Sequence, residues 1–150
     1  MHNDQNKTTP IGLARYAREF FNCALAADEK VGHKLGFASI PVMYLVAQSI
    51  ELCLKSYLVF KDVPLNDLRK KYGHDLIKCL KKAKELGLDK DTGVNLNEAE
   101  QYALVVLNEL YSTKQLNYII TGGKVFPAFT FIHTVSTKLL DAICPLVGYR

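Results

Sequence analysis

His74 is the residue in this sequence best suited to chemistry, and it lies in the segment DLRKKYGHDLIKCL. A histidine side chain can gain or lose a proton near neutral pH, which suits a general acid or base. The structural alternative is a residue at a helix entry whose ring contacts a carboxylate or a backbone group. The neighbouring Asp75 favours the positive end of a helix dipole under either interpretation.

Basic residues gather on both sides of His74. Seven lie between positions 69 and 84, among them Arg69, Lys70, Lys71 and Lys78. Such a group can neutralise phosphates, and a solvated charged helix face is the alternative. The whole chain has a formal net charge of only +4, so the local concentration of charge is more informative than the total.

Glu51 and Lys55 are a further pair of side chains that could take part in chemistry. They are four residues apart, in the order that favours an ion pair along a helix. Their helix is otherwise apolar, and buried charges need partners. Two interpretations stay open: a structural pair that also holds His74, or a polar cleft in which Lys55 neutralises phosphate.

Apolar periodicity and helix-boundary residues predict the elements that position these side chains. An all-α fold is expected, a bundle of four to five helices running up and down, in a single domain over residues 10–150 after a flexible leader at 1–9. The helices are expected at 10–31, 39–61, 74–86, 97–112 and 128–147, with a short helical turn at 66–72. Near 117–126 the pattern is consistent with either a short hairpin or an extended loop.

Two segments in order carry a resemblance to a known superfamily. The run AQSIELCLKSYLVF contains E-L-x-L-K on a hydrophobic helix, and GHDL opens the next helix some twenty residues later. The segment NELYSTKQLNYIITGGKVFP adds a weaker likeness. Over roughly Phe20 to Val135 the chain thus resembles the HEPN superfamily. That resemblance implies a helical bundle, frequently dimeric, and in many members a metal-independent ribonuclease of toxin–antitoxin or phage-defence systems.

The resemblance also implies roles for particular residues. The ribonuclease members place Arg four to six residues before His, a spacing that Arg69 and His74 share. The expected catalytic residues are therefore His74 and Arg69. The expected RNA- or nucleotide-binding residues are Lys55, Lys70, Lys71 and Lys78, and the expected supporting polar network is Glu51, Asp75 and Asn117. Asn117 stands where small HEPN-like proteins often carry Arg. No metal and no cofactor are expected.

Two further hypotheses remain open beside RNA binding or cleavage. One is a catalytically silent module that binds a nucleotide or a partner protein, such as a nucleotidyltransferase antitoxin. The other is a helical protein whose surface serves only dimerisation. A homodimer is expected in each case.

The absence of several sequence signals narrows the class of protein. The first residues have no apolar signal-peptide core, and no run of about 18 uncharged apolar residues occurs, so a cytoplasmic protein without a membrane span is expected. The sequence lacks a Gly-rich phosphate loop, H-E-x-x-H and G-x-S-x-G, which leaves nucleotide hydrolysis, zinc proteolysis and esterase chemistry without support. The four cysteines are scattered without a CxxC pair, as expected for small apolar residues in a core.

Overall fold

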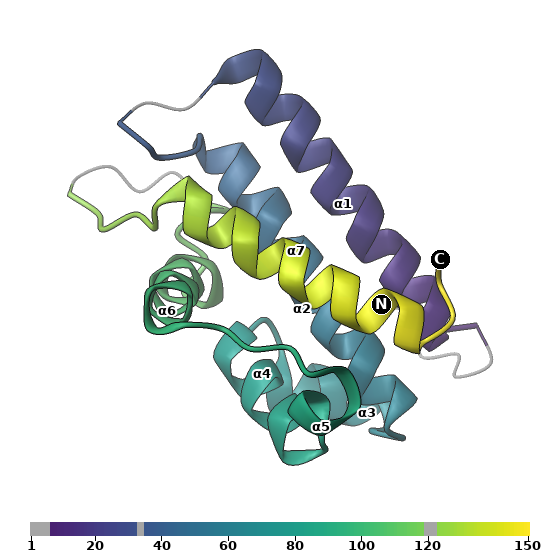
Figure 1. Cartoon of the computed structure of the whole chain (residues 1–150). Helices are drawn as coiled ribbons and strands as arrows, with labels where there is room; N and C mark the ends of the chain where they lie inside the picture. Colours follow the sequence, from purple (N-terminus) through teal and green to yellow (C-terminus); the bar gives the residue numbers. More distant parts are fainter. Residues whose placement is uncertain (1–6, 33–34, 119–122) are drawn as a thin grey trace.

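The computed structural model describes residues 7–32, 35–118 and 123–150, and its regular structure is helical (Figure 1). No β-strand forms in these three ranges, so the predicted all-α fold is confirmed. The helices are α1 (Pro10–Val31), α2 (Ile40–Phe60), α3 (Leu65–Asp67), α4 (Leu76–Glu85), α5 (Leu88–Thr92), α6 (Glu98–Ser112) and α7 (Phe129–Leu146). A π-helical turn, Leu68–Tyr72, joins α3 to the start of α4.

The first two helices begin where their capping residues predict. Thr9 caps α1, and its hydroxyl accepts a hydrogen bond from the Gly12 amide at 3.0 Å. Proline follows in the first turn of each helix, where its missing N–H costs no hydrogen bond. The predicted helix over residues 10–31 is therefore confirmed at both ends.

The helix α2 is the central element of the bundle. It packs along α1, where Ala14, Ala17 and Ala24 are fully buried and let the two backbones approach closely. The Ser49 hydroxyl also donates to the Ala17 carbonyl at 2.7 Å. By length and composition α2 could cross a membrane, but 72% of its most apolar stretch is buried inside this protein. Such burial is typical of the core helix of a bundle.

The bundle is not uniformly up and down. In Figure 1 α1 and α2 form an antiparallel pair and α7 lies alongside them, whereas α6 is seen nearly end-on and crosses the other helices. The short helices α3 and α5 close the lower end of the molecule together with α4. This lower end contains the π-helical turn and His74, so it is where the candidate site lies.

The chain between α2 and α4 turns sharply at Gly73. The Gly73 amide donates to the Leu68 carbonyl at 2.9 Å, which closes the π-helical turn. Gly73 itself has φ 49° and ψ −125°, a conformation that side chains disfavour. A π-helical turn is rare and is often found at a functional site.

The segment near 117–126 can be described only in part. Residues 119–122, with Gly122 of the proposed hairpin turn, lie outside the described residues. Residues 123–128 have no regular secondary structure. The first six residues of the expected leader also lie outside the described range.

Three of the four cysteines are buried, as expected of apolar core residues: Cys53, Cys79 and Cys144. Burial raises the pKa of the Cys79 thiol to about 12. Cys23 differs, because it lies on the exposed side of α1. The prediction that all four cysteines lie in the core is therefore wrong for Cys23.

Candidate functional site

A buried carboxylate organises the candidate site. The side chain of Glu51, on α2, is only 5% exposed. One of its oxygens accepts from the Lys55 ammonium at 2.9 Å. The other lies 2.8 Å from Nδ1 of His74 and accepts from the Tyr111 hydroxyl at 2.7 Å. The network thus joins α2, the turn before α4, and α6.

Lys55 ties the π-helical turn to α2. Its side chain is 3% exposed, and its ammonium also donates to the Gly73 carbonyl at 2.6 Å. This carbonyl points at Lys55 because Gly73 adopts the unusual conformation described above. Of the two interpretations of Glu51 and Lys55, these contacts fit the structural pair, in which Glu51 also holds His74. Phosphate binding at Lys55 does not fit this placement, because its ammonium is enclosed and already bound to a carboxylate and a carbonyl.

The position of His74 suits proton transfer better than that of any other network member. Its side chain is 56% exposed, while the Glu51 carboxylate beneath it is buried. A carboxylate only accepts hydrogen bonds, so Nδ1 of the ring carries the donated hydrogen. In the neutral ring Nε2 then keeps a lone pair for a ligand or water. The ring also lies edge-on to Tyr111, with 5.9 Å between ring centroids.

Asp75 belongs to a separate polar group beside the network. It is the N-cap of α4, because its carboxylate accepts from the Lys78 amide at 3.0 Å. The Asn108 side chain, from α6, donates to the same carboxylate at 3.1 Å and accepts from the Leu76 amide at 2.7 Å. Asp75 therefore positions the start of α4 and, with it, the residue His74 just before.

Tyr111 is a member of the network that the sequence analysis did not identify. It is 3% exposed, and burial together with the Glu51 charge holds the pKa of its hydroxyl well above the usual range. Tyr111 therefore remains a hydrogen-bond donor to Glu51. Its ring packs against Tyr44 of α2, with 6.0 Å between centroids. No local motif marks Tyr111, which lies 60 residues from Glu51 along the chain.

Asn117 lies away from the Glu51 carboxylate. It is exposed after the end of α6 and lines a hollow with Ile40, Pro41, Tyr44, Leu45 and Leu116. No hydrogen bond joins its side chain to the Glu51 network within the described part of the chain. It lines that hollow together with Tyr44, which packs on Tyr111.

The predicted basic residues lie on the surface, in the π-helical turn before His74 and in the first turn of α4 after it. Arg69, Lys70, Lys71 and Lys78 are all exposed. Lys71 pairs with Asp67 at 3.3 Å. The segment 69–84 contains seven basic residues and one acidic residue.

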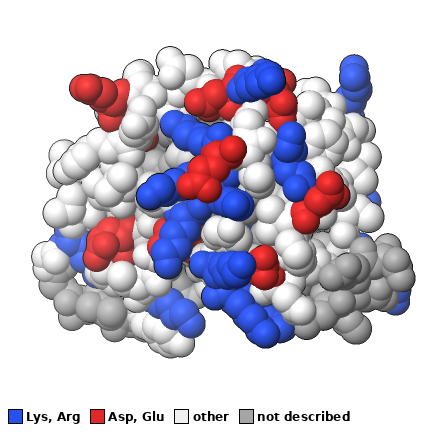
Figure 2. Space-filling view, turned by 90° about the horizontal axis from the view of Figure 1, so that it is seen from below, with Lys and Arg blue, Asp and Glu red and all other residues white. Residues whose placement is uncertain are grey.

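The charge pattern is visible in Figure 2, which views the molecule from the end that contains α3, α4 and α5. Lysine and arginine side chains gather over the middle of this face, with acidic side chains between some of them. A surface of this kind attracts anions at a distance, more strongly at low salt than at high salt. We call residues 69–84, where they are exposed, the basic face.

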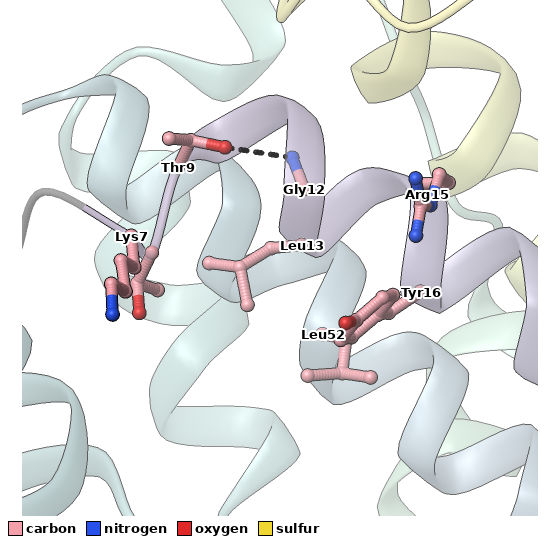
Figure 3. Close-up of a pocket in the computed structure, with 8 residues that line it drawn as sticks. Lys7, Thr9, Gly12, Leu13, Arg15, Tyr16 and Leu52 are labelled. Carbon is pink, nitrogen blue, oxygen red and sulfur yellow. Dashed lines mark hydrogen bonds between the residues drawn. The ribbon is translucent and has the colours of Figure 1, made fainter. Parts of the chain in front are cut away.

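A second hollow, at the N-terminus of α1, gathers none of the predicted site residues (Figure 3). It has a volume of about 330 Å³ and is lined mainly by α1, with Leu52 from α2. Its polar groups have local partners: Thr9 accepts from the Gly12 amide, and Arg15 pairs with Glu19 at 3.7 Å. Among the described residues, no histidine and no carboxylate line this hollow.

No group of three or more His, Cys, Asp or Glu side chains is arranged to hold a metal ion in the described residues. No family model, curated protein or solved structure matches this chain. The class that the fold and the site define is therefore an all-α protein with a buried Glu–Lys pair that holds an exposed histidine beside a basic face.

Proposed function

We propose that this protein binds the phosphates of RNA or nucleotides on its basic face, as a HEPN-like protein, and that His74 is the acid–base group of a metal-independent ribonuclease. The observation that carries the proposal is the His74 ring, half exposed to solvent and held through Nδ1 by a buried carboxylate. A carboxylate in this position orients the ring and fixes which ring nitrogen carries the hydrogen.

The basic face supports the phosphate-binding part of the proposal. Lys70 and Lys78 are exposed and flank His74 in the chain. Neither pairs with a carboxylate within the described residues. Their charges are therefore available to the backbone of a nucleic acid. Arg69 is expected to stabilise the negative charge that develops on phosphorus.

Charge reversal tests this binding. We expect Lys70→Glu combined with Lys78→Glu to weaken binding of a short single-stranded RNA at least tenfold, because two cations are replaced by anions. The logarithm of the parent protein's affinity should fall with the logarithm of salt concentration, by about 0.7 for each phosphate contact on a single strand. Fluorescence anisotropy titrations at low and physiological salt measure both effects.

Lys30→Glu is the control for this experiment, at half the change in net charge. Lys30 is exposed in the last turn of α1, far from the basic face along the chain. The single reversal there should leave RNA affinity within about twofold of the parent, beyond a small long-range effect of net charge. Equal weakening by Lys30→Glu would show that binding is not localised at the basic face.

A second candidate function rests on the exposed apolar side chains near α6. Tyr102 and Val105 are 67% and 51% exposed, and Val125 is 69% exposed. All three line one hollow of about 460 Å³. Exposed apolar clusters of this kind often mark association surfaces. On this evidence we propose, as the alternative, a catalytically silent module that associates through α6, first of all with a second copy of itself.

Light scattering tests the association. We expect the parent protein to have the mass of a homodimer at tens of micromolar, and Val105→Glu to have the mass of a monomer, because the change places a charge in the apolar cluster. Glu98→Lys, at the exposed start of α6, alters charge on the same helix without touching the cluster. A monomeric parent would contradict the dimer.

A further inference from the structure

A hollow between the π-helical turn and α4 has the chemistry of a nucleotide site. It has a volume of about 290 Å³ and is lined by Tyr72, Lys78, Lys81, Lys82 and Glu85. One tyrosine and three lysines therefore line the same hollow. This combination is typical of surfaces that stack a base and hold a phosphate.

The charges in the hollow are only partly balanced. Lys82 and Glu85 form an ion pair at 3.8 Å. Lys78 and Lys81 pair with no carboxylate in the residues that the structure describes. Two positive charges thus remain on one wall, and an anion placed there would be attracted by both.

Tyr72 supplies the aromatic side chain of the hollow. Its side chain is half-buried and packs against the hydrophobic core while it also lines the hollow. The Tyr72 carbonyl accepts from the Asp75 amide at 3.0 Å, which fixes the turn that carries the ring. A ring held in this way loses little freedom when a base stacks on it.

We propose that this hollow is the subsite for one nucleotide of single-stranded RNA, with the base stacked on Tyr72 and the adjoining phosphate bound by Lys78 and Lys81. The inference rests on the proposed function and deepens it, since it specifies which form of RNA the basic face takes. A base can reach Tyr72 only when it is unstacked from its neighbours, which single strands allow and duplexes resist. The volume is near the lower limit of ligand pockets, roughly 300 Å³, and suits one nucleotide.

The subsite adjoins the proposed acid–base group. Tyr72 precedes His74 by two residues, so their Cα atoms are at most about 7.6 Å apart. Lys78 follows in the first turn of α4. The hollow therefore lies on the same short segment of the chain as His74, which does not itself line it.

The test compares probes with and without bases. We expect Tyr72→Leu to weaken binding of a short oligoadenylate about tenfold, because leucine keeps the apolar contact with the core and removes the stacking ring. The same variant should bind inorganic polyphosphate, a polyanion without bases, as the parent does. Tyr72→Phe should retain the affinity for oligoadenylate, and Lys81→Gln should weaken binding of both probes.

A measurement on the unaltered protein makes the test independent of how the variants fold. An abasic oligoribonucleotide of equal length should bind the parent about tenfold more weakly than oligoadenylate. Equal affinities for these two probes, or tighter binding of duplex RNA, would overturn the subsite while leaving phosphate binding on the basic face intact. A parent protein that binds none of the probes would instead overturn the proposed function, and the subsite with it.

Discussion

Replacing Lys55 by methionine should lower the free energy of unfolding by about 3–5 kcal/mol, which is the cost of leaving one member of a buried ion pair without its partner. Both side chains of the Glu51–Lys55 pair are at most 5% exposed. The variant also removes the ammonium that binds the Gly73 carbonyl. Urea unfolding followed by circular dichroism measures the loss, which is a large share of the 5–15 kcal/mol typical of a domain.

Two control variants separate the buried charge from lysine replacement in general. Lys78→Met, on the exposed face of α4, should change the free energy of unfolding by no more than about 0.5 kcal/mol. Glu51→Gln added to Lys55→Met should restore part of the loss, because no charge is then left buried. A Lys55→Met protein as stable as the parent would show that the pair does not support the turn.

Replacing His74 by alanine should lower the rate of RNA cleavage by about 10²- to 10⁴-fold, the usual contribution of a general acid or base. In the proposed step Nε2 of His74 takes the proton of a ribose 2′-hydroxyl. The 2′-oxygen then bonds to the adjacent phosphorus, and the bond from phosphorus to the 5′-oxygen breaks. That oxygen takes a proton from solvent, so the products have a 2′,3′-cyclic phosphate and a 5′-hydroxyl.

This reaction is identified by its products and by its independence of metal ions. Cleavage of a short single-stranded RNA should persist in EDTA, and a substrate with a single 2′-deoxyribose at the cleaved position should stay intact. His133→Ala is the matched control, because His133 packs between Phe21 and Phe129, away from the Glu51 network. Cleavage by His74→Ala at the parent's rate would assign any observed activity to another group.

Local sequence patterns determined the longer helices and one contact of the network. The helix over residues 10–31 follows from Thr9, Pro10 and an apolar stripe, all of which act within a few residues. Asn97 and Glu100 predict a capping box, and both of its hydrogen bonds are present at the start of α6. Spacing of four residues likewise predicts the Glu51–Lys55 pair, since side chains four apart meet on one face of a helix.

Tertiary packing decided which charges are buried and what they bind. The sequence alone allowed Lys55 to bind either a phosphate or Glu51. The packing of the Gly73 turn over α2 decides for Glu51, because it encloses the Lys55 ammonium. The short helix α5 was not predicted, because five residues between Gly87 and Gly93 are too few to show a period.

The hydrogen bond from Tyr111 to Glu51 shows most clearly where sequence patterns stop. It joins residues 60 positions apart, whereas helical periodicity reports only on neighbours within a few turns. Tyr111 reaches Glu51 because α6 crosses the other helices and its buried Tyr111 hydroxyl donates to the Glu51 carboxylate on α2. A buried carboxylate needs such donors, but only the packing of the helices determines which residue supplies them.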